Sequence, residues 1–132
     1  MGETPRTRFE RTLKTMNQKG HFQSALLATM DGLPIASAPS SYDAESSIEM
    51  VTLVKQVVNR VYHQLRLAKV DEVSLVSRDG EKMVCRYFAH DGEEFILAIV
   101  APPDQCYRRV TSKAIHDIRD VLSGKGRVGV SV

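Results

Sequence analysis

The spacing of apolar residues along the chain predicts the order helix, two strands, long helix, three strands, helix. Apolar side chains recur at helical spacing in roughly residues 1–20, 45–67 and 105–122. Apolar runs bounded by turn residues mark the strands, at roughly 21–29, 33–38, 71–77, 82–89 and 94–101. Helices and strands therefore follow each other closely, without an internal repeat or a linker.

Asp-Gly dipeptides separate the neighbouring strands, at Asp31-Gly32, Asp79-Gly80 and Asp91-Gly92. Glycine reaches positive φ at little cost and aspartate tolerates it, so each dipeptide predicts a tight turn between antiparallel strands. Pro34 has no N–H to donate to a neighbouring strand, which places the second strand at a sheet edge.

Two strands lack polar alternation and should be covered on both faces. They contain Ala25–Ala28 and the continuous run Phe95–Ala101. These first and fifth strands should lie side by side at the centre, which gives the order 2-1-5-4-3. The predicted fold class is an α/β three-layer sandwich around a five-stranded antiparallel sheet. The long helix would cover one face and the two terminal helices the other.

The helix ends also carry sequence signals. Thr7 and Glu10 fit a capping box for the first helix. Asp104 follows Pro102-Pro103 and could cap the last helix, and Gly124 is placed to end it. The whole chain, 1–132, is expected to form one domain with its core at about 8–122. The tail, 124–132, has valines at alternate positions and could be a short added strand or a disordered end.

The long helix has more apolar surface than one sheet can cover. On a helical wheel its apolar residues span about 180°, whereas docking on one core requires a stripe of about 100°. The strand 71–77 should lie at an open edge, which invites pairing with another chain. A homodimer through both elements is therefore predicted, with the interface residues Val51, Val54, Val58, Val61, Tyr62, Leu65, Glu72, Ser74 and Val76.

Composition argues against nucleic acid and membrane as partners. Eighteen Lys and Arg stand against 16 Asp and Glu, for a net charge of +2, and the chain has no Trp. That charge is too small for a polyanion-binding surface, and base-stacking aromatics are few. No apolar run approaches the length of a membrane span. The two cysteines form no CxxC pair, which together with the absence of a signal peptide suggests a reducing cytoplasm.

No constellation of residues indicates catalysis. Cys106 lies near a predicted helix start, where a thiolate would be stabilised, but no His is near it in sequence. The four His residues form no metal-binding pattern, and Gly124-Lys125-Gly126 lacks P-loop spacing. Arg108-Arg109 could act as an arginine finger, but a solvated helix face explains the pair more simply. We therefore expect no catalytic residue, metal or cofactor, and a protein that is not an enzyme.

The stretch Met30-Asp31-Gly32-Leu33-Pro34-Ile35 resembles the first hairpin of the roadblock/dynein-light-chain family. The stretch from Tyr107 to Ile118 resembles the last helix of its bacterial and archaeal members. The resemblance implies a roadblock/profilin-like fold. It also implies dimers that join their third strands into one sheet and lay their long helices side by side. Some bacterial members activate a Ras-like GTPase without inserting a catalytic Arg, and others are scaffolds.

The leading hypothesis is a dimeric, non-enzymatic regulator or adaptor that binds a small Ras-like GTPase and stimulates GTP hydrolysis. The alternatives are a sensor-like domain with a small ligand, a pure scaffold subunit and, more distantly, an enzyme using Cys106. The resemblance places the GTPase on the polar ridge of the long helix, formed by Glu49, Thr52, Lys55, Gln56, Asn59, Arg60 and His63.

Overall fold

A computed structural model describes residues 3–31, 33–38 and 71–124, and between them residues 52, 56, 59–60 and 63–64. Its helices are α1 (Pro5–Gly20) and α3 (Arg108–Leu122). Its strands are β1 (Ser24–Thr29), β2 (Pro34–Ala38), β3 (Glu72–Val76), β4 (Lys82–His90) and β5 (Glu93–Ala101).

The strands form one antiparallel sheet in the order β2-β1-β5-β4-β3, as the sequence predicts. β5 is central, and β2 and β3 are the edges. The turn from β4 to β5 consists of Asp91 and Gly92, whose φ angles are 50° and 82°. Two consecutive positive φ angles are typical of a type I′ turn, which matches the twist of the strands it joins.

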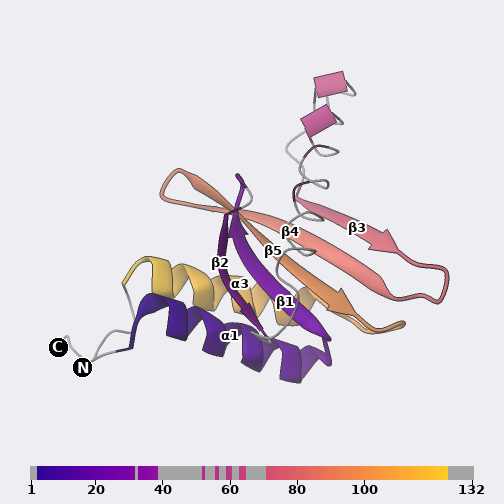
Figure 1. Ribbon diagram of the computed structural model, residues 1–132, viewed down its shortest axis with the longest axis horizontal. Coiled ribbons are helices and arrows are strands. Elements are labelled where there is room, and N and C mark those ends of the chain that lie inside the picture. Colours follow the sequence, from indigo (N-terminus) through magenta and orange to yellow (C-terminus); the bar gives the residue numbers. More distant parts are fainter. Residues whose placement is uncertain are drawn as a thin grey trace.

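α1 and α3 pack on one face of the sheet, below it in Figure 1. The core on this side joins Leu13 of α1 and Ile118 of α3 to Leu27 and Leu97 of the central strands, and all four side chains are buried. Each helix has one stripe of apolar residues and packs with that stripe against the sheet, since burial of the stripe removes it from water. This packing confirms the predicted layer of two terminal helices.

The opposite face of the sheet is also buried. Leu26, Cys85, Tyr87 and Ile96 form a second core cluster there. The described residues between 52 and 64 are helical, and Figure 1 draws them on the side of the sheet away from α1 and α3. They agree with the predicted long helix, whose other residues lie outside the described part of the chain.

Both helix starts differ from the sequence prediction. α1 begins at Pro5, and its cap is Thr4, whose hydroxyl accepts a hydrogen bond from the Thr7 N–H. Proline suits the first turn because it lacks an N–H that would have no partner there, so the helix starts earlier than a cap at Thr7 allows. Asp104 adopts a φ of 60° before the helix, and α3 begins only at Arg108 without a side-chain cap.

The predicted helix end at Gly124 agrees with the structure. α3 runs to Leu122, and Gly124 has a φ of 77° and donates its N–H to the Val121 carbonyl. α1 ends at Gly20 because His21, the next residue, adopts a left-handed φ of 58° and donates its N–H to the Asn17 carbonyl. Gly20 has no side chain, and the Phe22 ring occupies that space. A Cβ built on Gly20 would lie 2.3 Å from the Phe22 ring.

Gly20→Ala should therefore destabilise the fold. Displacing the buried Phe22 ring costs about 1–3 kcal/mol by overpacking. Alanine returns at most about 1 kcal/mol of helix propensity. We expect a net loss of about 1–2 kcal/mol in the free energy of unfolding in urea. Lys19→Ala, at an exposed position one residue earlier, is the control and should stay within about 0.5 kcal/mol of the parent. A Gly20→Ala protein of parental or higher stability would contradict this packing.

Candidate protein-interaction surface

Four of the five described residues of the predicted polar ridge are exposed. Gln56, Asn59, Arg60 and His63 are exposed and helical, and Thr52 is half-buried. Their spacing places them along one side of a helix. Glu49 and Lys55 of the ridge lie outside the described residues. So do the predicted interface residues Val51, Val54, Val58, Val61, Tyr62 and Leu65.

Among the described strands β3 is the sheet edge opposite β2, and it carries apolar side chains on its surface. Leu75 and Val76 are 44% and 62% exposed, and Ser74 is exposed as well. The Tyr87 N–H donates to the Asp71 carbonyl, and the Ser77 N–H donates to the Glu81 carbonyl. In an antiparallel pair such bonds alternate along the strand, so odd-numbered residues bond to β4 and even-numbered ones face outward. The backbone N–H of Ser74 is therefore directed away from the sheet.

Glu72, at the start of β3, turns its side chain towards α3. Its carboxylate accepts hydrogen bonds from the Tyr107 hydroxyl and the Arg108 guanidinium. The hydrogen bond to Glu72 raises the pKa of Tyr107, because a phenolate could not donate it. The start of the edge strand is thus fixed to the first turn of the last helix.

Arg86 completes this polar cluster from β4. The residue is 9% exposed, and its guanidinium donates to the hydroxyls of Thr111 and Ser112 at 2.9 and 2.8 Å. Its Nε lies 3.9 Å from the Glu72 carboxylate, which is an ion-pair distance rather than a hydrogen bond. A buried guanidinium needs such partners, since an unpaired buried charge is costly.

The cluster of Glu72, Arg86, Tyr107 and Arg108 was missed in the sequence. One signal was available, because Arg86 interrupts the apolar run of β4 and a charge within a buried strand requires a partner. Its partners lie on β3 and α3, too distant in sequence to be paired by spacing. The sequence prediction of the interface also omits the exposed Leu75, because it takes alternate residues of the strand, among them Ser74 and Val76.

The remaining candidates for chemistry lie apart. Cys106 is exposed, and Cys85 is buried, which raises the pKa of its thiol to about 12. His116, Asp117 and Asp120 share one exposed side of α3, where Asp117 is already paired with Lys113 at 2.8 Å. Arg108 and Arg109 are both exposed, and the Arg108 guanidinium is hydrogen-bonded to Glu72. None of the described helices is both long and apolar enough to cross a membrane.

The overall fold is shared with solved structures of low sequence identity. No family model and no curated protein sequence matches the chain. MglB of Myxococcus xanthus superimposes with a TM-score of 0.73 at 10% identity over 98% of both chains. The gliding protein MglB of Thermus thermophilus gives 0.70 at 16% identity, over 94% of this chain and 95% of that one.

A third structure, the roadblock/LC7 domain from Streptomyces avermitilis, has a TM-score of 0.64 at 18% identity. It covers 87% of this chain and 95% of its own. The chain has the roadblock fold. The resemblance noted in the first hairpin and the last helix is therefore confirmed at the level of fold.

Glu72→Ala should loosen the edge strand of this roadblock fold. Tyr107 and Arg108 would lose their acceptor and Arg86 its nearby carboxylate, and buried charge-assisted bonds contribute about 1.5–3 kcal/mol. Because Arg108 is largely exposed, we expect about 2 kcal/mol lower stability, with faster amide hydrogen exchange in β3 than in β5.

Glu93→Ala, at an exposed position of β5, is the matched control and should change neither quantity. In Glu72→Gln the pKa of Tyr107 should fall, because the neutral amide opposes the phenolate less than the carboxylate does. An unchanged tyrosine titration curve would show that the carboxylate does not hold the Tyr107 hydroxyl.

Proposed function

We propose that this protein is a homodimeric, non-enzymatic regulator that binds a small Ras-like GTPase. The open edge of β3 is the observation that carries the proposal. It combines outward-facing backbone groups with the exposed apolar side chains of Leu75 and Val76. Soluble proteins normally protect such an edge, so an edge left open is suited to strand pairing.

A second copy of the chain is the proposed partner for this edge. Two β3 strands can pair antiparallel about a twofold axis, so that each copy presents the same residues to the other. Such pairing gives the outward-facing N–H and C=O groups of Glu72, Ser74 and Val76 partners. It also joins the two sheets into one. The Glu72–Tyr107 and Glu72–Arg108 contacts hold the start of the strand in place for that pairing.

The GTPase is proposed to dock on the polar ridge of the long helix. The described ridge residues Gln56, Asn59, Arg60 and His63 are exposed, as a docking surface requires. A dimer presents the ridge twice, so one GTPase could contact both copies. Regulation would consist in biasing the switch loops of the GTPase towards a hydrolysing arrangement. A role for Arg108 as a finger is disfavoured because Glu72 holds its guanidinium.

Ser74→Pro tests strand pairing. Proline removes an N–H that faces away from β4, so the strand's own bonds to the sheet remain while pairing with a second copy loses a donor. We expect the dimer dissociation constant to rise by at least about tenfold, measured by sedimentation equilibrium.

Ser74→Ala is the control for this test, because it removes the side-chain hydroxyl and keeps the N–H. It should remain dimeric. A parent protein that is monomeric at tens of micromolar, or a Ser74→Pro variant as dimeric as the parent, would refute pairing through β3.

Lys55→Glu combined with Arg60→Glu tests the docking ridge. The two reversals should leave the dimer intact and weaken binding to a GTP-loaded GTPase from the same organism by about tenfold or more, because they invert the charge of the contact surface. Isothermal titration calorimetry would measure the binding.

Lys19→Glu combined with Arg109→Glu makes the same charge change on exposed positions of α1 and α3 and should bind as the parent does. Unchanged affinity of the ridge variant would move the docking site elsewhere. Binding without any increase in GTP hydrolysis would favour a scaffold. If no GTPase from the organism binds the parent protein, the regulator proposal fails.

A further inference from the structure

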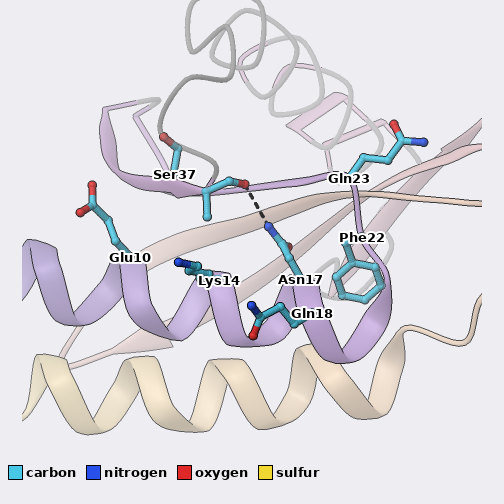
Figure 2. Close-up of a pocket in the computed structure, with 8 residues that line it drawn as sticks. Glu10, Lys14, Asn17, Gln18, Phe22, Gln23 and Ser37 are labelled. Carbon is cyan, nitrogen blue, oxygen red and sulfur yellow. Dashed lines mark hydrogen bonds between the residues drawn. The ribbon is translucent and has the colours of Figure 1, made fainter.

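A cleft of about 490 Å³ lies between α1 and the edge strand β2. In Figure 2 the side chains of Lys14, Asn17 and Gln18 project from α1, and Ser37 comes from the end of β2. Phe22, which follows α1, adds an aromatic ring to the lining. Ligand sites in proteins usually measure about 300–1,000 Å³, so the cleft is large enough to hold side chains of a bound molecule.

The cleft contains one charge without a partner. Its charged lining residues are Glu10 and Lys14. The Glu10 carboxylate lies 3.5 Å from the Arg6 guanidinium, one helical turn earlier, and forms an ion pair with it. Lys14 is exposed and has no ion-pair or hydrogen-bond partner among the residues that the structure describes. The cleft is therefore suited to a ligand with a carboxylate, which an ammonium group binds by a charge-assisted hydrogen bond.

Asn17 holds β2 at a fixed distance from α1. Its side-chain amide donates to the Ala38 carbonyl at 3.0 Å, and Figure 2 shows this hydrogen bond. The contact joins the last turns of the helix to the end of the strand. The cleft is thus preformed, and a ligand does not lose binding energy in ordering its walls.

The backbone of β2 offers a donor and an acceptor at the cleft. The Met30 N–H donates to the Glu94 carbonyl of β5, so even-numbered residues of β1 bond to β5 and odd-numbered ones to β2. Ala36 and Ala38 lie opposite odd-numbered residues and bond to β1. Ser37, between them, consequently directs its N–H and C=O outward. One residue of an added antiparallel strand can exchange two hydrogen bonds with these groups.

We propose that the cleft binds an extended acidic segment of a partner protein, which pairs antiparallel with β2 at Ser37. The two peptide residues that flank the paired one lie opposite Ala36 and Ala38, whose side chains belong to the core beneath α1. Opposite residues of paired strands point to the same face, so these two peptide side chains point towards α1. An apolar one covers the Phe22 ring, and an Asp or Glu pairs with Lys14.

A second copy of the chain fits this edge less well than an acidic peptide does. β2, Pro34–Ala38, has no acidic residue to pair with Lys14, and Pro34 has no N–H to donate. Glu10 of a second copy would already be paired with its own Arg6. The occupant is therefore a different chain. It binds at the edge opposite β3, so the inference depends neither on the proposed dimer nor on the GTPase proposal.

Short random peptides displayed on phage and selected against the full-length protein test the backbone pairing. We expect the selected peptides to share an acidic and an apolar residue two positions apart, the repeat of one strand face. Ser37→Pro removes the outward N–H and keeps the bonds of β2 to β1. The dissociation constant of a selected peptide, measured by isothermal titration calorimetry, should rise by about tenfold or more. Ser37→Ala keeps the N–H and should bind as the parent does.

Lys14→Glu tests the charge independently of the backbone. Because the position is exposed, the variant should be about as stable as the parent. It should bind a selected acidic peptide about tenfold more weakly or worse, and selection against it should yield Lys or Arg in place of the acidic residue. Lys19→Glu makes the same charge change at an exposed position of α1 outside the cleft and should bind as the parent does.

Three results would overturn the proposal. One is a selection that yields no binding peptide, or only peptides without an acidic residue. The second is a selected peptide that the parent, Ser37→Pro and Lys14→Glu bind equally, which would place it on another surface. The third is a Ser37 amide already protected from hydrogen exchange in the free protein. Protection that falls on dilution would assign the edge to a second copy, and constant protection would assign it to the chain itself.

Discussion

The structure depends on burying β1 and β5 side by side on both faces. Leu27 and Leu97 pack towards α1 and α3, whereas Leu26 and Ile96 belong to the core cluster on the opposite face. A pair of strands covered in this way buries apolar side chains on both faces, and such burial offsets the entropy that the chain loses on folding. It also fixes the register, because a shift of one residue would exchange the two faces of every buried side chain.

Burial at the centre of the sheet leaves the exposed edges for interaction. β3 carries exposed apolar residues and fixes its first residue through Glu72 to α3. β2 is the opposite edge of the sheet, beside the cleft that Phe22 and Asn17 help to line. The two edges thus differ, since β3 is held by a charge cluster and β2 borders a cleft with both apolar and polar lining residues. This difference is the physical basis for proposing a second copy of the chain at the β3 edge.

The polar cluster at Arg86 links the core to the proposed interface. A buried guanidinium holds its hydroxyl and carbonyl partners on α3 while its Nε lies near Glu72 on β3. Loss of Glu72 would leave the Tyr107 hydroxyl without its acceptor and the buried Arg86 guanidinium without its nearby carboxylate, so these members depend on one another. The orientation of the β3 edge is therefore coupled to the first turn of α3.

The sequence alone determined the strand order and the two-helix layer. Asp91-Gly92 required a tight antiparallel turn, Pro34 required an edge, and the unbroken apolar run of β5 required the centre. These are local constraints, because φ preference, a missing N–H and hydrophobic patterning act within a few residues. The roadblock resemblance of the first hairpin agreed with them.

The tertiary structure decided what local signals could not. α1 starts at Pro5 with Thr4 as its cap, and not after the capping box predicted at Thr7. Asp104 lies in a turn with positive φ, and α3 starts only at Arg108. Glu72 belongs to the predicted dimer interface, and its carboxylate accepts hydrogen bonds from Tyr107 and Arg108. These residues are 35 and 36 positions away in sequence. Such contacts form only when the sheet brings distant segments together. The energy of a buried charge depends on that whole environment and not on its neighbours in sequence.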